Sequence, residues 1–118
     1  LAADAGVEAI ALSNHGGRQL DGAPAPLSLV APVADAVGGR VEIICDGGVR
    51  RGSDIVKALA AGANACMAGR AYLYGRGAAG ERGVDRVLSW FRDDVERTML
   101  LVGASDIAAL DREFLDGS

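Results

Sequence analysis

Three short apolar stretches, each followed by polar and glycine residues, recur along the chain. They cover Val7–Leu12, Val41–Cys45 and Ala65–Ala68. Short, largely apolar stretches of this kind are typical of strands that are covered on both faces of a parallel sheet. We therefore predict three strands, at about residues 7–12, 41–45 and 65–68.

Apolar residues at spacings of three and four predict helices between and after these strands. The first helix is expected to hold Pro32 in its first turn and to end at Gly38. The second is expected to begin at a capping Ser53 and to end at Gly62.

The longest apolar repeat predicts a third helix from about Val84 to Leu101, ended by Gly103. Asp93 and Arg97 are four residues apart and are expected to pair on its outer face. A last short turn is expected after Ser105, which would cap it.

The order of these elements predicts consecutive βα units. Two α/β architectures fit: an open parallel sheet, or an arc of a (β/α)8 TIM barrel, which in full needs about 250 residues. Both place functional residues after the carboxyl ends of the strands, where the polar residues of this chain lie.

Composition narrows the function classes. Of the 118 residues 50% are hydrophobic, and the net charge of −4 gives no footprint for nucleic acid. No apolar run approaches the roughly 20 residues of a membrane span. Cys45 and Cys66 lie in apolar stretches and are interpreted as reduced packing residues, and with His15 as the sole histidine no metal site is expected.

The segment after the second strand has the composition of a phosphate loop. Residues 46–54 read Asp-Gly-Gly-Val-Arg-Arg-Gly-Ser-Asp and lead directly into a helix, whose first N–H groups attract anions. Arg50 and Arg51 add cations, and Gly69 and Arg70 follow the third strand. The alternative is a glycine-rich turn with solvated arginines.

The segment after the first strand combines a base with a cation. Residues 13–22 read Ser-Asn-His-Gly-Gly-Arg-Gln-Leu-Asp-Gly. The imidazole of His15 is a group that can accept a proton, and Arg18 can hold a carboxylate through two parallel hydrogen bonds. The pair suggests chemistry at carbon 2 of an acid; the alternative is a histidine with a structural role.

Together, residues 13–21 and 46–54 resemble the FMN-dependent L-2-hydroxy acid dehydrogenases and oxidases. Gly69-Arg70-Ala71-Tyr72-Leu73-Tyr74-Gly75 and Gly80-Glu81-Arg82-Gly83-Val84 add to the resemblance, which covers essentially all 118 residues. It implies an FMN-binding TIM barrel, with residues 1–118 as its C-terminal part, the last three βα units. The chain starts at Leu1 within apolar sequence, and we interpret it as a piece of a larger protein.

The resemblance also implies residue roles. His15 would be the active-site base, taking a proton from carbon 2 or from the 2-hydroxyl, and Arg18 would bind the substrate carboxylate. Ser13 and Asp46 would contact the flavin, with Asp46 at the ribityl hydroxyls. The FMN phosphate would be cradled by Gly47, Gly48, Val49, Arg50, Gly69 and Arg70.

Several expectations concern the complete protein. L-lactate is the favoured substrate; a related enzyme that modifies a peptide-derived redox cofactor typically departs at the position of Arg18, which is present here. We expect a homo-oligomer in the cytoplasm, or attached to the inner face of the membrane, with no nucleic-acid partner. The alternative is an incomplete barrel or assembly module, inactive until joined by the missing N-terminal part of the barrel.

The remaining aromatic residues are expected to be scaffold. Trp90 and Phe91 would pack within a helix, and Tyr72 and Tyr74 would support the fold. Arg76 and the glycine after it stand where relatives usually have an apolar pair, which leaves the start of the following helix open.

Overall fold

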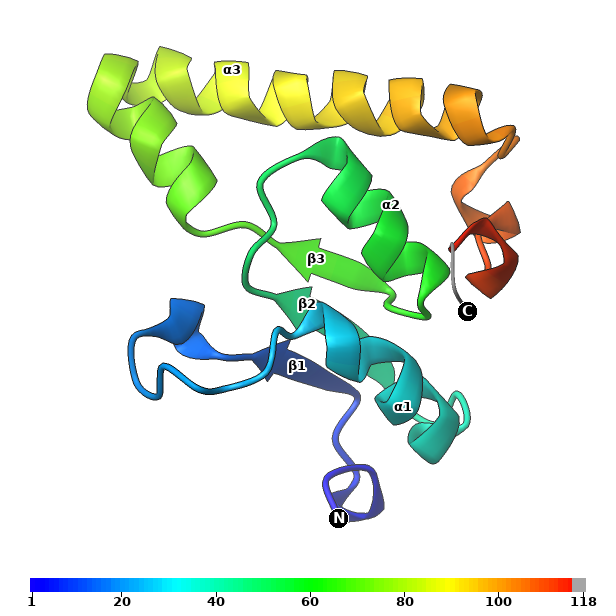
Figure 1. Ribbon diagram of the computed structural model, residues 1–118. Helices are drawn as coiled ribbons and strands as arrows, with labels where there is room; N and C mark the ends of the chain where they lie inside the picture. Colours follow the sequence, from blue (N-terminus) through cyan, green and yellow to red (C-terminus); the bar gives the residue numbers. More distant parts are fainter. Residues whose placement is uncertain (116–118) are drawn as a thin grey trace.

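The computed structural model describes residues 1–115 and contains a three-stranded parallel sheet with three main helices (Figure 1). The strand order is β1-β2-β3. Among residues 1–115, four short 3-10 helices lie before β1, directly after β1 and near the C-terminus. In chain order the elements are η1 (Ala3–Ala5), β1 (Ala9–Ser13), η2 (His15–Gly17), α1 (Leu27–Val37), β2 (Glu42–Asp46), α2 (Gly52–Ala60), β3 (Ala65–Met67), α3 (Arg70–Val102), η3 (Ile107–Ala109) and η4 (Arg112–Phe114).

The three predicted strands are present, with ends that differ by one or two residues. β1 begins at Ala9, because Val7 lies outside the ladder and is 40% exposed. Ser13 pairs in register with Asp46, and Asp46 with Met67. The carboxyl ends of the strands are therefore level, and the polar segments that follow β1 and β2 leave the sheet side by side.

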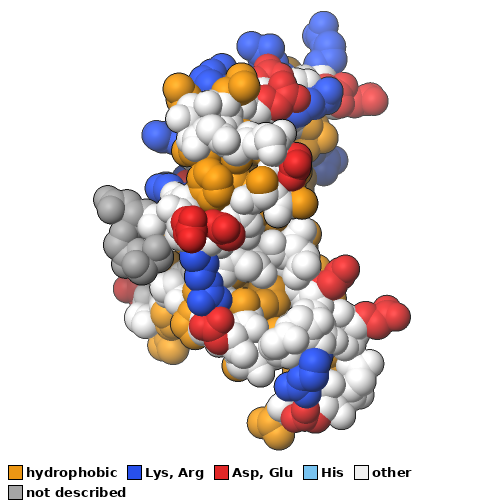
Figure 2. All heavy atoms as spheres, turned by 90° about the vertical axis from the view of Figure 1, so that its right-hand side faces the viewer, with side chains coloured by type: hydrophobic (Ala, Val, Ile, Leu, Met, Phe, Trp, Pro, Cys, Tyr) orange, Lys and Arg blue, Asp and Glu red, His pale blue; other side chains and the backbone are white. Residues whose placement is uncertain are grey.

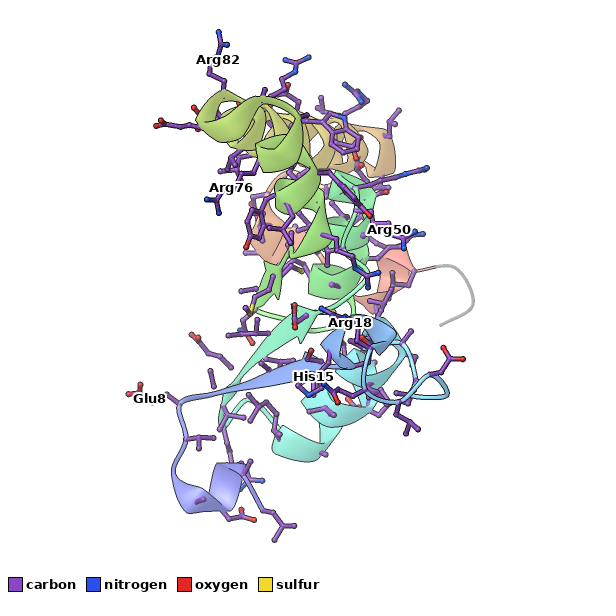
Figure 3. The ribbon with its side chains drawn as sticks, turned by 90° about the vertical axis from the view of Figure 1, so that its left-hand side faces the viewer. Glu8, His15, Arg18, Arg50, Arg76 and Arg82 are labelled. Atoms are coloured by element: carbon purple, nitrogen blue, oxygen red, sulfur yellow. The ribbon has the colours of Figure 1, made fainter. Side chains whose placement is uncertain are left out.

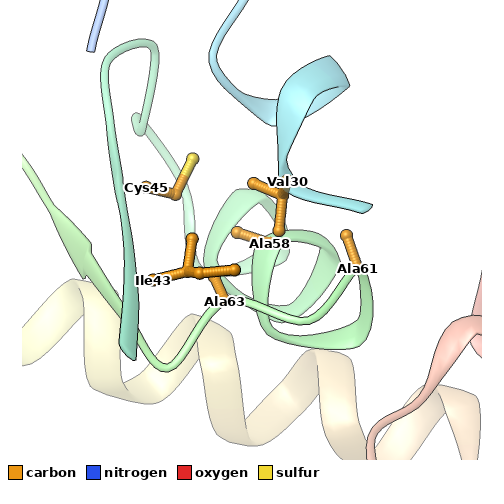
Figure 4. Packing of buried hydrophobic residues seen from close by; sticks show 6 residues of the cluster. All are labelled: Val30, Ile43, Cys45, Ala58, Ala61 and Ala63. Carbon is orange, nitrogen blue, oxygen red and sulfur yellow. The ribbon is translucent and has the colours of Figure 1, made fainter. Parts of the chain in front are cut away.

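Helices α1 and α2 cover one face of the sheet (Figure 4). The side chains between them are mostly small, so the helices lie close to the strands. This core consists of Val30, Ile43, Cys45, Ala58, Ala61 and Ala63.

The opposite face of the sheet is open within residues 1–115. Ala11 and Ala65 are exposed there, and Met67 is 51% exposed. Within residues 1–115 the strands are therefore covered on one face, by α1 and α2, and this part of the chain does not supply the cover predicted for the other face.

Helix α3 consists of two helical segments joined at Ala79 and Gly80, which have non-helical backbone angles. The segment after Gly80 contains the helix predicted from about Val84 to Leu101, whereas the segment that begins at Arg70 was not predicted. The chain turns at this break, so that the long second segment crosses above α2 (Figure 1). A Cβ on Gly75 would lie 2.5 Å from the carbonyl oxygen of Gly83, so the two segments touch through glycines.

Several predicted helix ends are also corrected. Pro32 lies inside α1, which begins after Pro26. The short turn predicted after Ser105 is η3, and it is capped by Asp106, whose carboxylate accepts from the Ala109 N–H at 2.9 Å, and not by Ser105.

The C-terminal part is fastened to α1 by an ion pair. The Arg112 guanidinium donates to both carboxylate oxygens of Asp35, at 2.7 and 3.1 Å, and to the Ala31 carbonyl at 3.1 Å. The hydrogen bond from Arg112 holds the pKa of Asp35 below its usual range.

Charged side chains of both signs gather over α3 at the top of the molecule (Figure 2). No helix among the described residues is long and apolar enough to cross a membrane.

Candidate functional site

The level ends of β1 and β2 join the two motif segments directly. The Ser13 hydroxyl donates to an Asp46 carboxylate oxygen at 2.7 Å, and the His15 N–H donates to the same hydroxyl oxygen at 3.1 Å. Ser13 thus connects the carboxylate of one segment to the backbone of the other. This contact supports the prediction that the two segments form one site.

His15 has an unusual backbone conformation. Its φ is 53°, and among residues 1–115 it is the only residue other than glycine with a positive φ. Such a conformation is uncommon for a residue with a β-carbon and is often found at functional sites. His15 is the first residue of η2 and is exposed.

His15 and Arg18 line a cavity of about 800 Å³ together with the glycine segments that follow β2 and β3. Figure 3 shows Arg18 beside His15, with Arg50 above them. Glu8, Arg76 and Arg82, also labelled there, are not among the residues that line the cavity. Every predicted site residue except Ser13 lines this cavity: His15, Arg18, Asp46, Gly47, Gly48, Val49, Arg50, Gly69 and Arg70.

The Arg18 guanidinium has free donors. Within residues 1–115 it makes no hydrogen bond or ion pair; only the Arg18 backbone N–H is engaged, with the His15 carbonyl at 3.4 Å. A guanidinium in this state can offer two parallel N–H groups to a carboxylate.

The N-terminus of α2 does not serve as the phosphate site that the sequence suggested. The N–H groups of Arg50 and Arg51 both donate to Asp54 Oδ2 at 2.9 Å. The N–H groups of Gly52 and Ser53 donate to Asp94 Oδ2, at 2.7 and 3.4 Å. Because carboxylates already satisfy these donors, the predicted anion site on this helix is wrong, and so is the predicted cap by Ser53.

The other residues that were predicted to bind the phosphate do suit an anion. Gly47 and Gly48 have φ values of 122° and 78°, which only glycine adopts readily, and a Cβ on Gly48 would enter open space. α3 begins at Arg70, and Gly69, Arg70 and Ala71 line the cavity, so the start of this helix lies beside it. With Arg50 and Arg70 on the lining, this set of backbone and guanidinium donors suits a phosphate.

Four residues of α3 with apolar or aromatic side chains form one wall of the cavity. From the sequence, Tyr74 and Trp90 were expected to be scaffold, and none of the four was predicted to line a site. Tyr74 is 74% exposed and Trp90 is 45% exposed, although Phe91 beside it is buried as predicted. The break at Gly80 brings these parts of α3 to one cavity, and no residue spacing signals this. The wall consists of Leu73, Tyr74, Val87 and Trp90.

The comparisons with known proteins agree with the motifs. Residues 1–117 match the FMN-dependent dehydrogenase family. The chain belongs to this family. FMN is therefore its cofactor, and the donor set around the cavity fits the phosphate of FMN.

Individual relatives carry several activities. The chain is 52% identical to pre-mycofactocin synthase of Mycolicibacterium smegmatis over 90% of its length and 47% identical to L-lactate oxidase of Roseobacter sp. over 97%. It superposes on the monotopic membrane protein (S)-mandelate dehydrogenase with a TM-score of 0.91 at 47% identity, covering 96% of this chain and 30% of that one. The chain spans only 27% and 31% of the length of the first two relatives.

Proposed function

We propose that the complete protein oxidises an L-2-hydroxy acid, with L-lactate favoured, to the 2-oxo acid in an FMN-dependent reaction. The observation that carries this proposal is the convergence of His15, Arg18 and the anion-binding glycine segments on one cavity. A base and a carboxylate clamp beside a phosphate site are the groups that this reaction needs.

We propose further that the three βα units are the sixth to eighth of a (β/α)8 barrel. The open face of the sheet supports this proposal, because a barrel interior would cover Ala11, Ala65 and Met67. The share of the relatives' length that the chain spans, about 30%, fits three units of eight. The missing N-terminal part of the barrel would supply the other walls.

In this proposal the residues of the chain bind, orient and deprotonate the substrate. Arg18 holds the carboxylate, which places carbon 2 and its hydroxyl near His15. His15 accepts one proton, either from carbon 2 or from the 2-hydroxyl, as the C–H and O–H bonds break and the C=O bond forms. FMN, when bound, would accept the two electrons; the second hydrogen would leave with them as hydride from carbon 2 or, where His15 takes the proton from carbon 2, as a proton from the 2-hydroxyl.

The cofactor would be held by both segments and by the start of α3. Gly47, Gly48, Val49 and Arg50 would contact the phosphate with Gly69 and Arg70. Asp46 would accept hydrogen bonds from ribityl hydroxyls through its second carboxylate oxygen, since Oδ2 already accepts from Ser13. Ser13 would contact the flavin side.

A second function is favoured by one observation. The 52% identity to pre-mycofactocin synthase raises modification of a peptide-derived redox cofactor as the competing activity. Arg18, with its free guanidinium, favours a carboxylic acid substrate instead. The third alternative is that residues 1–118 alone form an inactive assembly module.

The proposal for the complete protein includes its surroundings. We propose a cytoplasmic homo-oligomer, or a protein attached to the inner membrane face, as the description of a mandelate dehydrogenase relative as monotopic suggests. No nucleic-acid partner is proposed, given the net charge of −4.

Anaerobic mixing of the purified complete flavoprotein with single acids tests the function. We expect L-lactate to bleach the flavin absorbance faster than glycolate or L-mandelate, with D-lactate as the control. Bleaching by another L-2-hydroxy acid alone would correct the substrate. No bleaching by any of these acids would reject the proposed function.

A further inference from the structure

The strained His15 backbone is held by hydrogen bonds on its next residue, Gly16. The Gly16 N–H donates to Asn14 Oδ1 at 3.0 Å, and the Gly16 carbonyl accepts from the Arg70 guanidinium at 2.7 Å. Both polar backbone groups of Gly16 are thus fixed by side chains. Hydrogen bonds at both the N–H and the carbonyl of Gly16 therefore fix the direction in which the backbone continues after His15.

Asn14 supplies two of the contacts that close the turn. Besides the side-chain bond to Gly16, the Asn14 carbonyl accepts from the Gly17 N–H at 2.9 Å. Asn14 is half-buried, while His15 is exposed. Asn14 is therefore partly enclosed by the protein, whereas the His15 side chain is accessible from the solvent.

Asn14 also meets the segment that follows β2. A Cβ on Gly47 would lie 3.0 Å from Asn14 Oδ1 and 3.1 Å from a ring carbon of Pro26. The Asn14 amide therefore lies directly against the Gly47 backbone. The turn of His15 and the segment proposed to hold FMN are in contact through this one side chain.

We propose that Asn14 is a positioning residue that holds His15 in its left-handed backbone conformation and in register with the FMN segment. The proposal rests on the proposed function, in which His15 accepts a proton from the substrate. Without the Asn14 oxygen, the Gly16 N–H loses its acceptor, and His15 can relax to the negative φ that residues with a β-carbon prefer. The imidazole would then leave the position at which it reaches the substrate.

The test uses the complete flavoprotein with three substitutions, Asn14→Ala, Asn14→Ser and Asn14→Asp. The aspartate keeps an acceptor oxygen at the same place, and the serine keeps a shorter one. We expect the limiting rate of flavin reduction by L-lactate to fall about 10- to 100-fold in Asn14→Ala. The rate should be intermediate in Asn14→Ser and largely recovered in Asn14→Asp, while substrate affinity and FMN content stay unchanged.

Asn64→Ala is the matched control. Asn64 Oδ1 also accepts a backbone N–H, that of Ile43 at 2.8 Å, but Asn64 does not line the cavity. This variant should lose stability without slowing flavin reduction. If Asn14→Ala does not purify with FMN, the order of Asn14→Ser and Asn14→Asp decides the question.

A crystal structure of each variant separates this inference from the proposed function. We expect φ of residue 15 to turn negative in Asn14→Ala and to stay positive in Asn14→Asp. If no hydroxy acid reduces the unmodified protein yet φ changes in this way, the proposed function fails and the positioning role stands. An Asn14→Ala variant with positive φ and an unchanged rate overturns the inference, as do equal losses in the alanine and aspartate variants.

Discussion

Within residues 1–115 the Arg18 guanidinium makes no hydrogen bond or ion pair, whereas the Arg70 guanidinium of the same cavity already bonds to the Gly16 carbonyl. We predict that Arg18→Met lowers the second-order rate of flavin reduction by L-lactate by about 100-fold or more, because each charge-assisted hydrogen bond is worth about 1.5–3 kcal/mol. The loss should show mainly as weaker substrate binding. Measuring the anaerobic rate of flavin reduction over a range of L-lactate concentrations gives both the limiting rate and the substrate affinity.

Arg82→Met is the matched control for that substitution, because Arg82 lies outside the cavity lining. It should leave the titration unchanged. Equal behaviour of the two variants would remove Arg18 from the substrate site.

The two cysteines illustrate how burial controls a single residue. Cys45 and Cys66 pair in register between β2 and β3, and burial, with a smaller contribution from Cys45, raises the pKa of Cys66 to about 11. The neutral thiol is therefore the form favoured by the fold, and the thiolate appears only as pH rises toward that value.

We predict that iodoacetamide modifies Cys66 very slowly at pH 8 in the native protein and rapidly after unfolding in urea, because about one thiol in a thousand is ionised at that pH. Peptide mass spectrometry of the alkylated protein measures this. Rapid alkylation of the native thiol at pH 8 would contradict the packing role.

At the scale of elements, one side chain of α3 fixes the start of α2. Asp94 accepts from the Gly52 and Ser53 N–H groups and also pairs with Arg97 at 3.4 Å, where the sequence suggested Asp93 as the partner. The side chain of Asp94 is only 19% exposed. It therefore acts as a helix cap supplied by a neighbouring helix.

We predict that Asp94→Ala lowers the free energy of unfolding by about 1–2 kcal/mol, the usual worth of a lost N-terminal cap. Asp93→Ala, on the neighbouring exposed residue, should change it little. Urea unfolding of the complete protein, followed by circular dichroism, measures the difference. An equal effect of both substitutions would contradict the capping role.

The same contact shows what the sequence could and could not predict. The strands, the three helices and the candidate base and cations follow from local spacing and residue type. The cap by Asp94 could not be predicted, because it joins residues 42 positions apart. The cavity wall of Tyr74 and Trp90 depends on the turn of α3 at Gly80, which local patterns do not encode.

At the scale of the whole molecule, the open face of the sheet determines how residues 1–118 behave alone. Exposed Met67 and the unpaired edges of β1 and β3 would contact solvent. We predict that the isolated chain associates instead of remaining a 12.0 kDa monomer, binds FMN weakly or not at all, and oxidises no hydroxy acid. Light scattering and flavin fluorescence measure these properties; a yellow, active monomer would contradict the barrel assignment.

The central claim is that His15 is the base of an L-2-hydroxy acid oxidation. Rapid anaerobic mixing of the complete flavoprotein with L-lactate, with and without His15→Ala, tests it most directly. We predict that the substitution slows flavin reduction by about 10²- to 10⁴-fold while FMN remains bound, because a positioned base contributes that much. Flavin reduction at an unchanged rate in His15→Ala would contradict the account.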